Sequence, residues 1–219
     1  MTKAKERYKR FSNAVDGFII NNPVLSRGLG IASIVVASGT LKNAVALSLA
    51  FFIVVIPTLF FASLMKDRLQ SWIRAFVYAF IASIFYPLAY LAVSRLFTSQ
   101  IRIDLGIYLP LTILNTIIIY RAERCAIKSK PHIAIWDGFL HGFGYVFTLC
   151  GIAVIREVVG RGTIWGQTLS FVTRPISGVS LPFFGFILLG VLSALYHKAG
   201  AMARKFVAKL DREKVGEDL

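Results

Sequence analysis

The sequence is short of acidic residues, histidine and cysteine, which limits the chemistry open to it. Its 219 residues include 11 Asp and Glu, three His and two Cys, against 25 Lys and Arg. Cys125 and Cys150 are separated by 24 residues, with no His or carboxylate at the spacing of metal ligands. A cysteine-based metal motif is therefore excluded there. We expect Cys125 to be a free thiol and Cys150 to be a buried apolar residue.

The sequence also lacks any long polar stretch from which a soluble domain could be built. Hydrophobic residues make up 56% of the chain and the mean hydropathy is +0.67, values typical of membrane proteins. We predict an all-α integral membrane protein with no soluble catalytic domain. The six predicted transmembrane segments, within a membrane domain of residues 21–197, are 21–38, 44–64, 75–94, 105–120, 138–155 and 179–196.

Positive charge is distributed unevenly between the predicted loops. If the N-terminus is cytoplasmic, the cytoplasmic regions hold 18 Lys and Arg and the opposite side holds six. This bias predicts that both termini are cytoplasmic. Orientation and attraction to anionic lipid headgroups then explain the net charge of +14, and nucleic-acid binding is not expected. We expect residues 1–20 to be a basic amphipathic segment on the cytoplasmic surface and residues 198–219 to be a charged cytoplasmic tail.

The six segments fall into two halves with the same plan. The first and fourth segments contain helix-breaking residues, Pro23, Gly28 and Gly30 in one and Gly106, Pro110 and Asn115 in the other. Since each half has three spans, the second half enters the membrane from the opposite face. This arrangement is typical of an inverted repeat whose broken helices meet near the bilayer midplane. The repeats would cover about residues 21–97 and 101–197. The alternative is a pair of ordinary kinked helices.

Several blocks carry a resemblance to a known family. "NNPVLSRGLGI", "GIYLPLTILN", "YRAER", "DGF" and "REVVGRGTIWG" occur in order between residues 21 and 166. They resemble the membrane proteins shared by Rnf electron-transport complexes and sodium-translocating NADH:quinone reductases, specifically the E subunit of the former and the D subunit of the latter. The resemblance implies six spans in two inverted halves and pairing with a homologous subunit of opposite topology. It also implies an iron–sulfur cluster held in the membrane by a cysteine from each broken helix.

Both positions that the resemblance assigns to cluster ligands lack cysteine. Ala32 follows the Gly-Leu-Gly run in "GLGIAS", and Thr116 follows the asparagine of "LNT". An iron–sulfur cluster requires thiolate ligands, which neither residue supplies. We therefore expect a relative that keeps the fold, binds no cofactor by itself and relies on flavin or iron–sulfur centres of partner subunits.

Charged residues near the segment ends offer further candidates. Arg27 lies within the first segment, where it either has a function or extends to the interface. Asn115 is expected to bond backbone freed by a helix break. Gly138 and Gly142 form a small-xxx-small pair suited to close helix packing. The candidates for an ion path or a partner-docking surface are Arg27, Glu123, Asp137, Arg156 and Glu157. The alternative interpretation is that Arg121 with Glu123, and Arg156 with Glu157, are solvated ion pairs at helix ends.

These observations lead to a membrane subunit of an Rnf/Nqr-like complex that couples electron transfer to sodium or proton translocation. The subunit itself would be non-catalytic and would lie in a bacterial or archaeal cytoplasmic membrane. A cluster-free secondary transporter on the same fold is the alternative. A purely structural anchor for peripheral redox proteins is a third hypothesis.

Overall fold

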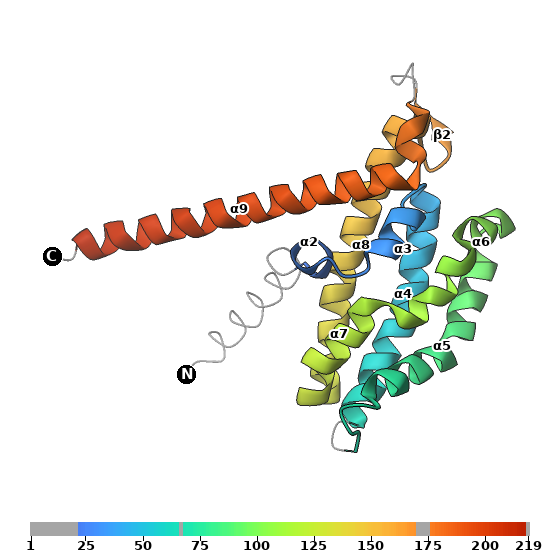
Figure 1. Ribbon diagram of the computed structural model, residues 1–219, viewed down its shortest axis with the longest axis horizontal. Helices are drawn as coiled ribbons and strands as arrows, with labels where there is room; N and C mark the ends of the chain where they lie inside the picture. Colours follow the sequence, from blue (N-terminus) through green and yellow to red (C-terminus); the bar gives the residue numbers. More distant parts are fainter. Residues whose placement is uncertain (1–21, 66–67, 170–175, 218–219) are drawn as a thin grey trace.

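The computed structural model describes residues 22–65, 68–169 and 176–217, with side chains as far as residue 202. The predicted amphipathic segment of residues 1–20 therefore lies outside the described residues. The elements, shown in Figure 1, are mostly helical. In chain order they are α2 (Pro23–Arg27), α3 (Ile31–Ala37), α4 (Leu41–Leu64), α5 (Arg74–Leu96), α6 (Ser99–Leu105), η2 (Gly106–Tyr108), η3 (Pro110–Leu114), α7 (Thr116–Arg124), η4 (Ala126–Lys128), α8 (Pro131–Arg161), β1 (Thr163–Ile164), β2 (Gln167–Thr168), η5 (Ser177–Ser180) and α9 (Pro182–Glu217).

Helix α4 is the central element of the fold. It begins at the N-cap Thr40, whose hydroxyl accepts a hydrogen bond from the Asn43 N–H. Helices α5 and α8 pack on it, and it also contacts α7 and η4 (Figure 1). Within its most apolar window 56% of the residues are buried, compared with 28% for α5. The core of the protein therefore surrounds a helix that carries no ionisable residue after Lys42.

Two glycines allow α8 to approach α4 closely. A Cβ atom at Gly138 would lie 2.8 Å from Leu59 Cδ1, and one at Gly142 would lie 2.6 Å from Phe52 Cε1. Both distances are shorter than a normal contact between carbon atoms. The packing role predicted for this small-xxx-small pair is therefore confirmed.

This contact gives a first testable prediction. We expect Gly142→Ala to lower the free energy of unfolding by about 1–3 kcal/mol, because the new methyl group must displace the Phe52 ring. The matched control is Gly151→Ala on the same helix, where an added Cβ would meet nothing within 4 Å; we expect it to be neutral or slightly stabilising. Unfolding in mixed detergent micelles measures both, and equal stabilities of the two variants would contradict this packing argument.

Five helical stretches in the described ranges are long and apolar enough to cross a membrane: residues 41–64, 74–96, 99–128, 131–161 and 182–202. They correspond to five of the six predicted segments. The remaining segment consists of α2 and α3, with five and seven residues, which are each too short to span a bilayer. The predicted count of six spans is therefore not confirmed, whereas the helical membrane architecture is.

A short hairpin that we did not predict follows α8. Strands β1 and β2 pair antiparallel, with Thr163 opposite Thr168 and Ile164 opposite Gln167. Trp165 and Gly166 between them have φ values of 56° and 78°, the two positive values that a type I′ turn requires. Each strand has only two residues, which is too few to show the alternation of polar and apolar residues that marks a strand in a sequence. The hairpin was therefore not recognisable from the sequence.

Helix α9 makes few contacts with the rest of the fold. It crosses α2 and α3 and then extends away from the other helices (Figure 1), and only 11% of its apolar window is buried. It continues as one helix to Glu217, so the described part of the predicted tail of residues 198–219 is an extension of α9. Its exposed apolar residues include Phe183, Phe186, Ile187, Val191 and Leu195. A surface of this kind is suited to lipid or to another membrane chain.

Candidate functional site

The two predicted helix breaks are present and lie against each other. Gly28 ends α2 with a φ of 66°, and Gly30 precedes α3 with a φ of 72°, a conformation that glycine adopts without steric cost. In the other segment, Asn115 is extended between η3 and α7. The Gly30 N–H donates a hydrogen bond of 2.9 Å to the Thr116 hydroxyl oxygen. One break therefore satisfies a backbone group freed by the other, as non-helical backbone within a membrane requires.

Two asparagines stabilise the helices that begin at these breaks. Asn22 caps α2 by accepting hydrogen bonds from the Val24 and Leu25 N–H groups, and Asn115 caps α7 by accepting one from Ile117. The Asn22 amide also donates to α8, at 3.0 Å to the Gly144 carbonyl and 3.0 Å to the Thr148 hydroxyl. The role of Asn22 was missed, although an Asn followed directly by proline is a recognisable helix start.

Tyr145 of α8 fills the space behind the first break. A Cβ atom added to Gly30 would lie 3.2 Å from its ring and 3.2 Å from Ile117 Cδ1. The Tyr145 hydroxyl donates to the Ser33 hydroxyl at 3.0 Å, and Ser33 donates to the Gly30 carbonyl at 2.9 Å. Close packing and positive φ together make Gly30 hard to replace. The sequence offered no sign that Tyr145 belongs to this site.

The residues at the two ligand positions are not enclosed by this packing. Ala32 and Thr116 are both exposed, as are Arg27 and Gly28 of the first break. Pro110, by contrast, is half-buried at the start of η3. The junction of the breaks therefore has exposed residues both at the start of α3 and at the start of α7.

Three predicted charged residues lie near the end of α7. Arg121 forms two hydrogen bonds with the Asp137 carboxylate, one of them 2.7 Å long, and both side chains are largely buried. Glu123 accepts a hydrogen bond from Tyr78 and pairs with Arg74 at 3.5 Å. Asp137 therefore forms a buried bidentate ion pair, while Glu123 forms a more exposed one. The expected solvated pair of Arg121 with Glu123 is not present among the described contacts.

Arg156 is buried at the opposite end of the fold, where it joins three elements. It is 1% exposed, and its guanidinium donates to the carbonyls of Val35, Val179, Ser180 and Leu181 and to the Ser38 hydroxyl. These acceptors lie at the end of α3 and in the segment that leads into α9. No carboxylate pairs with it among the described residues.

Glu157 is also buried, 2% exposed, and it binds backbone groups. One carboxylate oxygen accepts from the Leu41 N–H at 2.6 Å, and the other accepts from Gly166 N–H and the Thr163 hydroxyl. It therefore ties the start of α4 to the hairpin. The interpretation of Arg156 and Glu157 as a solvated pair is wrong, because both side chains turn inward and bind different elements.

Comparison of the sequence with known proteins identifies the family of the chain. The chain matches a family model described as "Rnf-Nqr subunit, membrane protein" over residues 10–193. The chain belongs to the Rnf-Nqr family. It is 31% identical over 196 residues to the E subunit of the ion-translocating oxidoreductase complex of Shewanella baltica (strain OS185), covering 83% of this chain and 84% of that one. It is 33% identical over 192 residues to the protein of the same name from Haemophilus influenzae (strain PittEE), covering 81% of each.

The residues at the break junction do not fit the iron–sulfur cluster that the Rnf-Nqr resemblance implies. Alanine at position 32 has no donor atom, and Thr116 offers a neutral hydroxyl that already accepts the Gly30 N–H. In the ranges that the structure describes, no three His, Cys, Asp or Glu side chains lie close enough to hold a metal ion. The chemistry of these residues therefore does not support a cluster bound by this chain at the junction.

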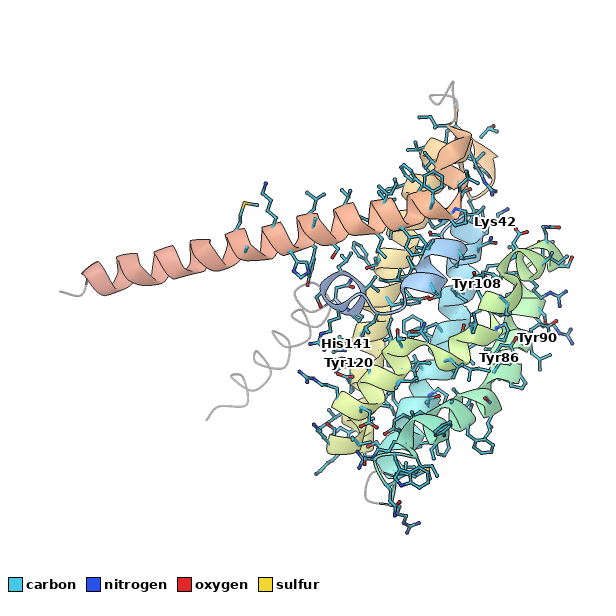
Figure 2. The ribbon with its side chains drawn as sticks, in the orientation of Figure 1. Lys42, Tyr86, Tyr90, Tyr108, Tyr120 and His141 are labelled. Atoms are coloured by element: carbon cyan, nitrogen blue, oxygen red, sulfur yellow. The ribbon has the colours of Figure 1, made fainter. Side chains whose placement is uncertain are left out.

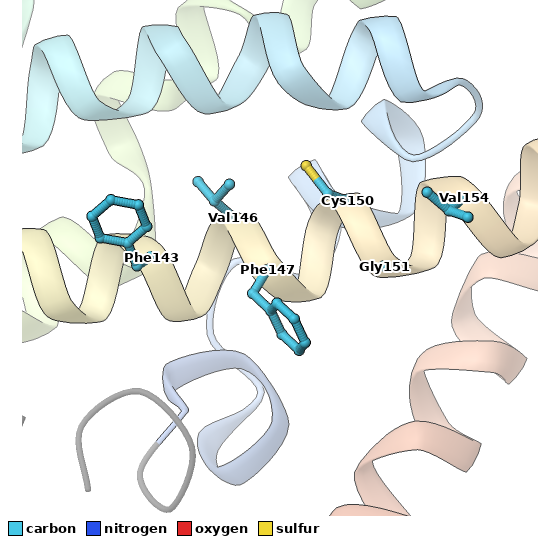
Figure 3. Close-up of a pocket in the computed structure, with 6 residues that line it drawn as sticks. All are labelled: Phe143, Val146, Phe147, Cys150, Gly151 and Val154. Atoms are coloured by element: carbon cyan, nitrogen blue, oxygen red, sulfur yellow. The ribbon is translucent and has the colours of Figure 1, made fainter. Parts of the chain in front are cut away.

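The two cysteines do not supply the missing ligands. Cys125 follows α7, with its sulfur 3.5 Å from the Ser129 hydroxyl. Cys150 lies on α8 five residues after Tyr145, about 7.5 Å along the helix axis, so a single thiol from a third element is all that it could bring to the junction. It lines a groove of about 360 Å³ together with Phe143, Val146, Phe147, Gly151 and Val154 (Figure 3). The surroundings of Cys150 are apolar, as predicted, although the residue itself is only half-buried.

The bond between the breaks provides a second testable prediction for this Rnf-Nqr protein. We expect Thr116→Val to lower the free energy of unfolding by about 1–2 kcal/mol, because the Gly30 N–H loses its acceptor while side-chain volume is kept. Thr116→Ser retains the hydroxyl and is expected to stay within about 0.5 kcal/mol. Hydrogen exchange at the Gly30 amide is the local readout. Unchanged protection of that amide in Thr116→Val would show that the bond does not hold the breaks together.

Proposed function

We propose that this chain is a membrane subunit of an ion-translocating oxidoreductase complex of the Rnf type. The names of its relatives, which are E subunits of such complexes, support this assignment. The subunit itself is non-catalytic, and electron transfer uses flavin or iron–sulfur centres of its partners. It lies in a bacterial or archaeal cytoplasmic membrane with both termini on the cytoplasmic side, as the distribution of Lys and Arg favours.

The observation that carries the proposal is the junction of the two breaks. Gly30 and Thr116 are 86 positions apart in the sequence and share a hydrogen bond, as expected if α2–α3 and η3–α7 are corresponding parts of two inverted three-segment repeats. In this arrangement α2 and α3 together form the first segment. The six-segment arrangement follows from that correspondence.

The exposed face of the junction is the proposed contact for a homologous membrane subunit of opposite topology. Ala32, Thr116 and Gly28 lie on it without cover, and the low burial of α5 and α9 leaves further apolar surface for protein and lipid. This chain contributes no thiolate to the contact. Its role is to bind the partner subunit. The hydrogen bond between Gly30 and Thr116, and not a metal cluster, joins the two breaks near the midplane.

Purification of the protein from its native membrane in mild detergent tests the proposal. Iron, acid-labile sulfide and flavin are measured together with the identities of the chains that purify with it. We expect stoichiometric flavin and iron with a homologous membrane partner, and no iron on this chain once the partner is dissociated. A protein that purifies alone, without iron or flavin, would refute membership of a redox complex. It would favour the transporter alternative, which substrate uptake by reconstituted vesicles can then test.

A further inference from the structure

Three arginine side chains lie around Tyr120, in the middle of α7. The guanidinium carbon of Arg27, from α2, lies 4.7 Å from the centre of the Tyr120 ring. The corresponding distances for Arg121 and Arg124 are 6.0 Å and 5.9 Å. All three are within the range of a cation–π contact. Figure 2 labels Tyr120 beside His141, where α2, α7 and α8 come together.

In the described part of the chain, the acidic side chains near this ring do not balance its positive charge. Asp137 binds Arg121 through both of its oxygens, and His141 contacts the same carboxylate. Glu123 pairs with Arg74. Among the described residues, neither Arg27 nor Arg124 has a carboxylate partner. Two cations on one ring repel each other, and an anion between them would relieve that repulsion.

The position of the ring along the helices indicates which anion is available. Helix α8 has 31 residues, about 46 Å, so when centred it extends about 8 Å beyond a hydrocarbon core of about 30 Å at each end. Asp137 is six residues from the start of α8, about 9 Å along the axis. Its partner Arg121 is therefore near the hydrocarbon boundary. Arg124 lies a further turn of α7 toward the same end, at the level of the lipid headgroups.

We propose that Arg27 and Arg124, both resting on the Tyr120 ring, bind the phosphate of an anionic phospholipid. A guanidinium recognises phosphate oxygens through paired N–H donors, and basic residues between membrane helices at headgroup depth are typical lipid sites. Arg27 and Arg124 are both exposed, so a lipid can reach them from outside. The Tyr120 ring brings the two guanidinium groups to the same place, at 4.7 Å and 5.9 Å from its centre. The site borders the Gly30–Thr116 junction, since Arg27 directly precedes Gly28 of the first break, and it is built from residues of this chain alone.

Titration of the purified, delipidated chain with phosphatidylglycerol and with phosphatidylcholine tests the proposal, with bound lipid counted by native mass spectrometry. We expect preferential binding of phosphatidylglycerol by the unmodified protein. The double variant Arg27→Gln/Arg124→Gln should weaken that binding by about 10- to 30-fold and leave phosphatidylcholine binding unchanged. Tyr120→Leu keeps both charges and removes the ring, so we expect an intermediate loss of about twofold to fivefold.

The matched control is Arg68→Gln/Arg95→Gln, which removes two exposed arginines from other parts of the fold and changes the net charge equally. We expect less than about a threefold effect on phosphatidylglycerol binding. Circular dichroism confirms that each variant is folded. Equal losses in the two double variants would overturn the proposal, since binding would then depend on net charge alone. So would an absence of preference in the unmodified protein, or cross-linking of Arg27 to an acidic membrane partner with lipid binding unchanged.

Discussion

Replacing Arg156 with leucine is expected to lower the free energy of unfolding by about 3–5 kcal/mol. The guanidinium is 1% exposed and donates to four carbonyls and one hydroxyl. Leucine removes the guanidinium donor from all five acceptors, and among the described hydrogen bonds only the Val35 and Leu181 carbonyls keep another donor, from the Ser38 hydroxyl and the Phe184 N–H. Since the acceptors belong to the end of α3 and to the segment that enters α9, we also expect faster proteolysis between residues 176 and 181. Unfolding in mixed micelles and limited proteolysis measure the two effects.

Two further variants separate this effect from loss of charge. Arg161→Leu removes an exposed arginine at the end of the same helix, and we expect a change within about 0.5 kcal/mol. Arg156→Lys keeps the charge but has fewer donors, set in a different geometry, so it should recover only part of the stability. If Arg156→Leu and Arg161→Leu are equally stable, the guanidinium does not hold α3 and α9 together.

Glu157→Gln should have the second-largest effect, a loss of about 2–4 kcal/mol in the free energy of unfolding. Both carboxylate oxygens accept hydrogen bonds, from Leu41 on one side and from Gly166 and Thr163 on the other. Glutamine keeps one acceptor and turns an NH₂ group toward at least one of these donors. It also removes negative charge from the first turn of α4, where the helix dipole favours an anion.

Hydrogen exchange locates the consequence of this substitution. We expect the amides of Leu41 and Gly166 to lose protection in Glu157→Gln, while the amides in the middle of α4 change little. Glu123→Gln serves as the comparison, because that carboxylate is 41% exposed and forms a single ion pair at 3.5 Å; we expect a loss below about 1 kcal/mol. Protection of the Leu41 amide that persists in Glu157→Gln would contradict the capping role.

The interruptions of the membrane helices were predictable because they depend on local backbone chemistry. Gly28 and Gly30 adopt positive φ values, and proline and asparagine stand where helices begin. These effects involve residues within a few positions of one another, so they are visible in the sequence. The pairing of Gly30 with Thr116 was not predictable from a residue pattern, because it joins positions that only the folded chain brings together.

The roles of Arg156 and Glu157 were misjudged for a related reason. Adjacent charged residues at the end of a predicted span are usually solvated, and the sequence does not reveal which side of the helix other segments will cover. Here the end of α3, the hairpin and η5, which leads into α9, close over the two residues. The hairpin was itself too short to recognise in advance. The binding partners of these two side chains therefore had no signal in the sequence.

The central place of α4 has a consequence for how the protein is made. Helix α4 enters the membrane early in synthesis, when its neighbours are lipids. These lipids must later be replaced by α5 and α8. The ribosome completes α8 about 100 residues after the end of α4, about 5–20 s later at about 5–20 residues per second. During that interval the Phe52 and Leu59 side chains face lipid or the insertion machinery. Until Gly138 and Gly142 arrive, α4 has α5 as a neighbour but lacks its contact with α8, so the final packing of the core depends on a helix that is synthesised late.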